Sequence, residues 1–175
     1  EAHYNLGATL QELGRLEEAI YSYAEAIALK HDSAEAHYNL GITFQELGRL
    51  DEALACYNQA IALKPDFAEA HNNLGNTLQA VGRFDEAEAS YNQAIALKPD
   101  YAEAHYNLGS TLKELGSLNE AAVNYRQAIA LKPDFAKAHY NLGITLQELR
   151  RLDEAVDSYA QAIALKSDYA EAYNN

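Results

Sequence analysis

Residues 34–67, AEAHYNLGITFQELGRLDEALACYNQAIALKPDF, decide the fold of this chain, because their pattern returns along its whole length. The segment that follows, AEAHNNLGNTLQAVGRFDEAEASYNQAIALKPDY, aligns with it without a gap and is identical at 25 of 34 positions. We number the positions of the repeat from Ala34 as position 1. We expect a single array over residues 1–175, made of repeats at 1–33, 34–67, 68–101, 102–135 and 136–169 and the opening of a sixth at 170–175.

Each repeat carries two sets of apolar residues with helical spacing. The first set occupies positions 3, 7, 11 and 14 and predicts helix A, and the second occupies positions 17, 20, 24, 27, 28 and 30 and predicts helix B. Glycine at position 15, such as Gly48, suits the left-handed backbone that ends a helix. Asp66 precedes Glu69 by three residues, which predicts a capping box at the start of the next helix A.

A second glycine, at position 8, lies inside helix A, where glycine costs roughly 1 kcal/mol relative to alanine. We expect it to face the alanine at position 20 of helix B, as Gly41 would face Ala53, so that two small residues bring the helices close together. One hairpin alone cannot bury both apolar stripes, so neighbouring hairpins must stack. The sequence therefore predicts an all-α array of antiparallel helix-turn-helix hairpins with one continuous core.

The pattern resembles the tetratricopeptide repeat (TPR), which has Leu-Gly at positions 7 and 8, alanine at 20 and 27, an aromatic residue at 24 and proline at 32. The resemblance covers the whole chain and implies a right-handed superhelical solenoid with the A helices on its concave surface. The chain departs from the family at position 4, where histidine replaces the frequent tryptophan, and at His31 and Ser167, which replace proline. Arg150 replaces the glycine at position 15, which predicts a strained or altered turn in the fifth repeat.

Composition restricts the classes of partner. Lys and Arg number 13 against 26 Asp and Glu, and the resulting formal charge of −13 repels nucleic acids and anionic membranes. No apolar stretch approaches the roughly 18 residues of a membrane span, and Cys56, the single cysteine, cannot form an internal disulfide. We therefore expect a cytoplasmic protein without nucleic-acid or membrane partners. The pattern is cut at both ends, so we also expect the chain to come from a longer array.

No cluster of reactive side chains interrupts the repeat. Cys56 stands where other repeats have serine or asparagine, which indicates a tolerated small residue and not a nucleophile. Helices in a stack lie roughly 8–10 Å apart, whereas zinc ligands converge on an ion at about 2 Å. We therefore expect no metal, no cofactor and no catalysis, and we expect the position 4 histidines to pack at the junctions between repeats. These histidines are His3, His37, His71, His105 and His139.

Asparagine at position 6 is the informative residue, because it is a mediocre helix former that needs a hydrogen-bonding partner. Positions 5, 9 and 13 have drifted between the repeats, but position 6 has not. One explanation is a hydrogen bond to the adjacent helix within the stack. The other comes from resemblance: the spacing looks like the TPR array of O-linked N-acetylglucosamine transferase, whose asparagines form a ladder that grips the backbone of an extended peptide. Glutamate at position 19 is also invariant, and the dipole of helix B is a sufficient explanation for it.

We favour the ladder and predict a protein-interaction scaffold that binds an extended peptide in an acidic concave groove. Glutamates at positions 2 and 13 make the groove acidic, so we expect a basic or neutral ligand. Two alternatives stay open: end-to-end self-association through open stacking faces, and service as the substrate-recognition part of a larger glycosyltransferase-type enzyme. The predicted peptide-binding residues are Asn5, Asn39, Asn73, Asn107, Asn141 and Asn175 at position 6, with Tyr4, Tyr38, Tyr106 and Tyr140 at position 5.

Overall fold

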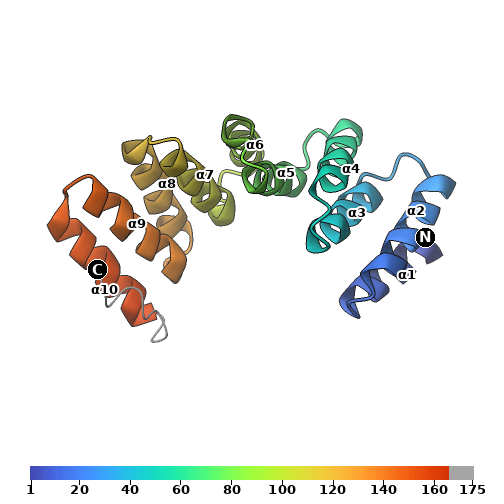
Figure 1. Ribbon diagram of the computed structural model, residues 1–175, viewed down its shortest axis with the longest axis horizontal. Helices are drawn as coiled ribbons and strands as arrows, with labels where there is room; N and C mark the ends of the chain where they lie inside the picture. Colours follow the sequence, from blue (N-terminus) through green and yellow to red (C-terminus); the bar gives the residue numbers. More distant parts are fainter. Residues whose placement is uncertain (166–175) are drawn as a thin grey trace. The chain divides into compact units, whose positions relative to one another are not determined.

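The computed structural model describes residues 1–165, and every regular element in that range is an α-helix (Figure 1). The ten helices form five hairpins, one in each predicted repeat, which confirms the all-α fold. We call the first helix of each hairpin an A helix and the second a B helix. The A helices are α1 (Ala2–Glu12), α3 (Ala34–Glu46), α5 (Ala68–Ala80), α7 (Ala102–Glu114) and α9 (Ala136–Glu148). The B helices are α2 (Leu16–Leu29), α4 (Leu50–Leu63), α6 (Phe84–Leu97), α8 (Leu118–Leu131) and α10 (Leu152–Leu165).

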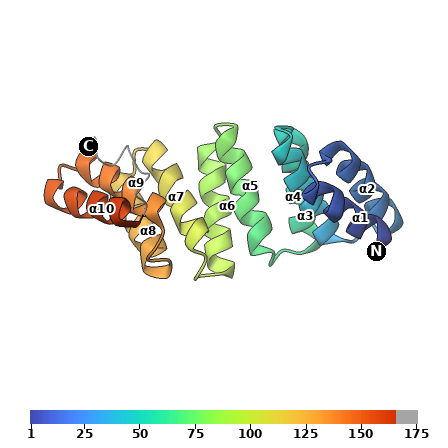
Figure 2. The same ribbon diagram turned by 90° about the horizontal axis from the view of Figure 1, so that it is seen from below.

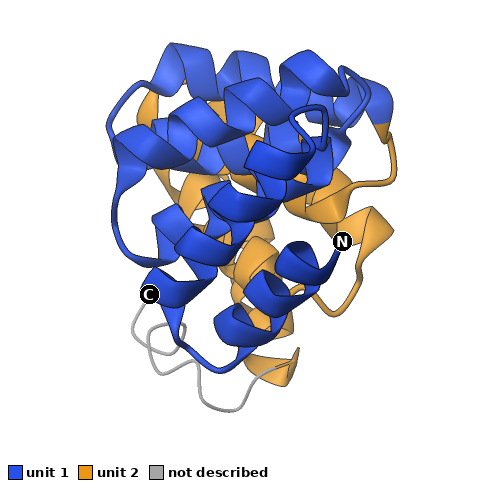
Figure 3. Ribbon diagram, turned by 90° about the vertical axis from the view of Figure 1, so that its right-hand side faces the viewer, with its two compact units in different colours: residues 1–97 blue, residues 98–175 orange. Residues whose placement is uncertain are grey.

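The chain divides into two compact units (Figure 3). The first unit, Glu1–Leu97, holds α1 to α6, and the second, Lys98–Asn175, holds α7 to α10. In the first unit α2 packs against α3 and α4 against α5, and in the second α8 packs against α9, so the hairpins of each unit are stacked. A single array over residues 1–175 and its right-handed superhelix stay predictions. Ser167 and the opening of the sixth repeat lie outside the described residues.

Within each unit the A helices lie next to one another. Helices α1, α3 and α5 contact one another in order, as do α7 and α9, whereas no two successive B helices of a unit make contact to the same extent among the described residues. Figure 2 shows the two helices of a hairpin side by side, most clearly for α5 and α6. The A helices therefore form the inner side of each unit. We call the surface formed by side chains at positions 2, 6, 9, 12 and 13 of these helices the A face.

Each hairpin closes around the tyrosine at position 24. The exposed fraction of Tyr57 is 0%, as is that of Ala53 at position 20. A Cβ atom added to Gly41 would lie 2.8 Å from Tyr57 Cε1, closer than van der Waals contact allows. The predicted alanine at position 20 is also a neighbour, because a Cβ atom added to Gly109 would lie 3.2 Å from the backbone oxygen of Ala121, but the prediction missed the tyrosine as the nearest group. The tyrosine lies one turn further along the same side of helix B, and its larger ring reaches the glycine first.

The turn between helices A and B is the same in the fifth repeat as in the others. Gly48 has φ +74°, its N–H donates to Gln45 O at 3.0 Å, and Arg150 reproduces this turn with φ +61° and an N–H···O distance of 3.0 Å to Gln147. The turn is therefore not altered by the arginine. It is strained, because a residue with a Cβ atom is disfavoured in this left-handed region.

The predicted capping box at Asp66 and Glu69 was wrong. Helix α5 begins at Ala68, its N-cap is Phe67, and no side chain caps it. Asp66 lies one residue too early, because the Lys-Pro-Asp segment forms a turn in which Phe67 N–H donates to Lys64 O at 3.1 Å. In the first repeat Ser33 takes the place of the aromatic residue, and there its Oγ caps α3 by accepting from Ala36 N–H at 3.2 Å.

Candidate peptide-binding face

The asparagines at position 6 take part in the stacking of the repeats. In three of them, Asn39, Asn73 and Asn141, the side-chain amide donates to the hydroxyl of the tyrosine at position 5 in the preceding repeat. The bond therefore joins neighbouring A helices and provides the stacking partner that was one of the two explanations for this position. The pairs are Asn39 Nδ2 with Tyr4 Oη at 2.8 Å, Asn73 Nδ2 with Tyr38 Oη at 3.1 Å, and Asn141 Nδ2 with Tyr106 Oη at 2.9 Å.

These bonds belong to a small polar network beneath the A face. Tyr57 Oη donates to Gln45 Oε1 at 2.8 Å, and Thr77 Oγ1 of the next repeat donates to the same oxygen at 3.2 Å. Burial raises the pKa of Tyr57, and a hydrogen bond from Asn73 partly opposes this rise. Among the described residues every buried side-chain nitrogen and oxygen has a hydrogen-bond partner. The network therefore satisfies the polar ends of the tyrosines where two repeats meet.

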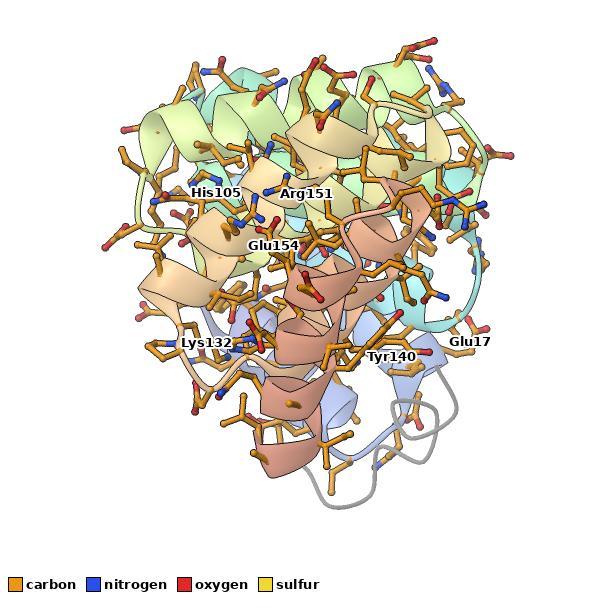
Figure 4. The ribbon with its side chains drawn as sticks, turned by 90° about the vertical axis from the view of Figure 1, so that its left-hand side faces the viewer. Glu17, His105, Lys132, Tyr140, Arg151 and Glu154 are labelled. Atoms are coloured by element: carbon orange, nitrogen blue, oxygen red, sulfur yellow. The ribbon has the colours of Figure 1, made fainter. Side chains whose placement is uncertain are left out.

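The tyrosines at position 5 are half-buried and pack within their own hairpin. Each ring contacts the tyrosine at position 24, with centroid distances of 5.8–6.0 Å. Figure 4 shows Tyr140 on α9, where its ring meets Tyr159 of α10 at 5.9 Å. These residues are thus part of the hairpin core, with one edge left to solvent. The four are Tyr4, Tyr38, Tyr106 and Tyr140.

Not every predicted asparagine has the same surroundings. Asn5 is exposed, whereas Asn39, Asn73, Asn107 and Asn141 are half-buried. Asn175 lies outside the described residues. The peptide-binding role of the ten predicted residues stays a prediction.

Two cavities share the residues at positions 9, 12 and 13 of the A helices but differ in their other lining residues. In the first unit Ile42, Gln45, Glu46 and Asn73 line a cavity of about 280 Å³. In the second unit Ile144, Gln147 and Glu148 occupy the same positions 9, 12 and 13 and line a cavity of about 590 Å³, together with Leu118 and Arg150. Sequence reasoning missed position 9, because we treated it only as a position that drifts. The isoleucines at this helical surface position were the available signal.

Hydrogen bonds and ion pairs engage several of the carboxylates on the A face. Gln11 Nε2 donates to Glu46 Oε1 at 3.1 Å, and Lys113 Nζ lies 3.5 Å from Glu148 Oε1, so position 12 of one repeat contacts position 13 of the next. The glutamates at position 2 are also paired with lysines at position 31. These pairs are Lys64 with Glu35 at 3.4 Å and Lys132 with Glu103 at 3.1 Å.

The position 4 histidines lie at the junctions between repeats, as predicted. In three of them, His71, His105 and His139, the Nε2 atom lies within hydrogen-bonding distance of the carbonyl oxygen of the proline at position 32 of the preceding repeat. Among residues 1–165 no group of three or more His, Cys, Asp or Glu side chains is arranged to hold a metal ion. The pairs are His71 with Pro65 at 3.1 Å, His105 with Pro99 at 3.2 Å, and His139 with Pro133 at 3.1 Å.

Two further residue types have structural explanations. Cys56 is buried, and burial raises the pKa of its thiol to about 11, so it is protonated near neutral pH. In every repeat except the fourth, where position 16 is Ser117, the glutamate at position 19 accepts hydrogen bonds from an arginine at position 16, as Arg151 Nε donates to Glu154 Oε1 at 2.7 Å (Figure 4). The helix dipole was therefore an incomplete explanation, and the recurring arginine three residues earlier was the missed signal.

None of the described helices combines the length and apolar character required to cross a membrane.

Comparison with known protein families identifies the repeat. Family profiles described as "TPR repeat" match residues 10–48, 43–82, 80–116 and 109–150, and one described as "Tetratricopeptide repeat" matches residues 136–169. The chain therefore belongs to the tetratricopeptide repeat family. Proteins of this family are non-catalytic scaffolds that bind protein or peptide partners. A search of curated protein sequences found no match.

Solved structures share the fold. A crystal structure of MamA is 26% identical, with a TM-score of 0.87 over 94% of this chain and 96% of that chain. A thermophilic TPR protein of Thermus thermophilus is 25% identical, with a TM-score of 0.74 over 99% and 94% of the two chains. YrrB is 24% identical, with a TM-score of 0.83 over 98% and 89%. Similarity to the O-linked N-acetylglucosamine transferase array in particular gains no support from these matches.

Proposed function

We propose that the A face binds an extended peptide segment of basic or neutral character. The observation that carries this proposal is the pair of cavities at positions 9, 12 and 13, in which an isoleucine lies beside glutamine and glutamate side chains in each unit. An apolar floor with a few polar groups is typical of peptide and ligand sites. The cavity of the first unit joins residues of α3 to Asn73 of α5, so a ligand in it would cross two neighbouring repeats, which suits an extended segment.

The asparagines would contact such a peptide through their side-chain oxygens. Their amide nitrogens are engaged by tyrosine hydroxyls, so they are not the first choice for binding a peptide carbonyl. The side-chain oxygens of Asn39 and Asn141 take no part in these bonds, whereas Asn73 Oδ1 accepts from Asn72 Nδ2 at 3.2 Å. An amide oxygen binds a peptide N–H without regard to sequence. We therefore keep the ladder in a narrower form, with asparagine as an acceptor only.

Exposed carboxylates favour a basic ligand. Glu46 and Glu148 line the two cavities, and Glu12 and Glu114 occupy the same position 13 on α1 and α7. The chain as a whole carries a formal charge of −13. YrrB, which has the same fold, is described as a TPR protein with an unusual peptide-binding site, and this likeness supports a peptide as the ligand class.

Charge reversal on the A face tests the proposal. The probe is a fluorescein-labelled peptide of Gly, Ser and Lys, and binding is followed by fluorescence anisotropy. Replacing the four position 13 glutamates with lysine should weaken binding by about tenfold or more, equivalent to about 1.4 kcal/mol. The same variant should gain affinity for a peptide in which Glu replaces Lys.

A matched control separates the A face from general attraction between opposite charges. The exposed acidic residues at position 18 lie on the B helices, so their replacement changes the net charge by the same amount on another surface. If both variants lose affinity equally, or if the natural chain does not bind the lysine peptide, the proposal is wrong. The control set is Glu17, Asp51, Asp85 and Asp153.

Self-association is a second candidate function, favoured by two exposed apolar side chains, Leu6 on α1 and Val156 on α10. Leu6 at position 7 is 50% exposed, whereas its equivalent Leu40 is 8% exposed because a preceding hairpin covers it. On α10, Val156 is 65% exposed, whereas its equivalent Leu54 is 8% exposed. Two such apolar faces could stack as neighbouring repeats do.

Light scattering over a concentration series tests this second function. Association should depend on concentration and should be abolished by Leu6→Glu or Val156→Glu. Tyr21→Glu is the matched control, because Tyr21 is 67% exposed at position 22, which is exposed in every repeat. A chain that stays monomeric at high concentration rules out the self-association function.

A further inference from the structure

The first unit contains a cavity that the proposed function does not use. Its volume is about 510 Å³, and it lies between the first hairpin and the start of α3. Tyr4, Ala26 and Ala36 provide apolar surface, Lys30 provides a cation, and Ser33 lies at position 34. The cavity is thus an apolar site beside a positive charge.

The second and fourth repeats show what fills this place elsewhere. Position 34 is Phe67 in the second repeat, and its ring lies 4.7 Å from the ring of Tyr38, the equivalent of Tyr4. Lys64, the equivalent of Lys30, places its Nζ 4.6 Å from the centre of the Phe67 ring. Phe135 has the same two neighbours in the fourth repeat, with a centroid distance of 4.8 Å to Tyr106 and 5.1 Å from Lys132 Nζ.

Serine in place of the aromatic residue therefore leaves a ring-sized site open in the first repeat. The Ser33 hydroxyl is engaged as the N-cap of α3 and does not substitute for a ring. We infer that this cavity binds an aromatic side chain, Phe, Tyr or Trp, of the bound segment, and this inference rests on the proposed function. The ring would lie against Tyr4 and beneath the ammonium group of Lys30, the environment that Phe67 has in its own repeat.

The rim of the cavity restricts the ligand further. Glu1 and Glu35 also line it, and their carboxylates disfavour a ligand with acidic residues beside the ring. A basic or neutral segment with one aromatic residue fits both the rim and the charge of the A face. The cavity thus adds a side-chain preference to a surface that otherwise contacts the peptide backbone.

A small aromatic probe tests the cavity separately from the peptide groove. The probe is N-acetyl-4-fluorophenylalaninamide, observed by fluorine NMR with the full chain, and N-acetylphenylalaninamide and N-acetylalaninamide are the competitors. Saturable binding should be displaced by the phenylalanine amide and not by the alanine amide. Ser33→Phe should weaken binding by about tenfold or more, because the new ring fills the cavity as Phe67 does.

Two further variants complete the experiment. Ser33→Thr keeps a capping hydroxyl and most of the cavity and should bind the probe like the natural chain. Phe67→Ser should create a second site, which raises the number of bound probes from one to two. No saturable binding, or equal binding by Ser33→Phe, overturns the inference. If the probe binds as expected but charge reversal on the A face does not change the affinity for the lysine peptide, the aromatic site is supported and the proposed peptide-binding function is wrong.

Discussion

Replacing Asn73 with alanine should destabilise the first unit by about 0.5–2 kcal/mol. The change removes the hydrogen bond to Tyr38 Oη at 3.1 Å, the polar contact with the hydroxyl of buried Tyr57, and the bond that Asn73 Oδ1 accepts from Asn72 Nδ2 at 3.2 Å. Each bond contributes about 0.5–1.5 kcal/mol net. Alanine recovers up to about 0.7 kcal/mol because it is the better helix former. Water can replace the lost donor at half-buried Tyr38, so the lower half of the range is expected.

A double-mutant cycle isolates the bond between the repeats. Asn73→Ala, Tyr38→Phe and the double variant are unfolded with urea, and far-ultraviolet circular dichroism follows the loss of helix. Because the repeats unfold as coupled units, the curves are fitted with nearest-neighbour terms between hairpins. The coupling free energy between the two substitutions should be about 0.5–1.5 kcal/mol. It should appear in the term between the second and third repeats.

The first repeat provides the matched control. Asn5 occupies the same position as Asn73, but it is exposed, so Asn5→Ala should leave stability unchanged or raise it slightly through helix propensity. A coupling energy near zero between Tyr38 and Asn73 would refute the stacking role of this bond. Equal losses for Asn5→Ala and Asn73→Ala would refute it as well.

Three other substitutions test the packing, the turn and the pH response. Gly75→Ala places a Cβ atom 2.6 Å from Tyr91 Cε1. The cost of this overpacking, about 1–3 kcal/mol, should outweigh the roughly 1 kcal/mol that alanine gains in helix propensity. The midpoint of urea unfolding should therefore fall. Arg150→Gly should raise the midpoint of thermal unfolding. Glycine relieves about 1–2 kcal/mol of strain in the left-handed conformation, which exceeds the roughly 0.4–1 kcal/mol that a more flexible unfolded chain costs. An unchanged midpoint would contradict this strain. Burial lowers the pKa of His37 below its ordinary value of 6.5, and the hydrogen bond from the His37 ring to the His31 backbone only partly opposes this. As pH falls from 6.5 toward the lower pKa of folded His37, the unfolded chain therefore binds more protons than the folded chain, and the free energy of unfolding decreases. This decrease, measured by urea unfolding over the same pH range, should be steeper in the natural chain than in His37→Gln.

The repeat boundaries and the helices could be predicted because their signals are local and occur five times. Apolar spacing places a helix regardless of its neighbours, and a glycine at position 15 ends helix A wherever it occurs. Arg150 shows the limit of this reasoning. The arginine predicted a strained or altered turn, and only the structure decides between them: the backbone hydrogen bonds that close the turn at Gly48 also hold Arg150, at a strained φ.

The incomplete and wrong predictions concerned which side chain is the nearest neighbour in the folded chain. Gly41 could have faced either Ala53 or Tyr57, since both lie on one side of helix B, and only ring size and direction decide between them. The residue at the N-cap of α5 depended on the length of the turn that begins with Lys-Pro-Asp. The cavity beside Ser33 could have been inferred from the sequence, because position 34 is aromatic in every later repeat, but only packing shows that Tyr4 and Lys30 surround the missing ring.

The invariance of position 6 does not distinguish a stacking residue from a binding residue, because one amide can serve both functions. Its nitrogen donates inward to the tyrosine of the preceding repeat, and its oxygen lies at the other end of the same planar group. A tyrosine hydroxyl fixes the orientation of that group, so the oxygen is held in place before any ligand arrives. Such preorganisation lowers the entropy lost on binding. Stacking and recognition would then favour the same residue, because asparagine is the smallest side chain that places a donor and an acceptor on two separate atoms.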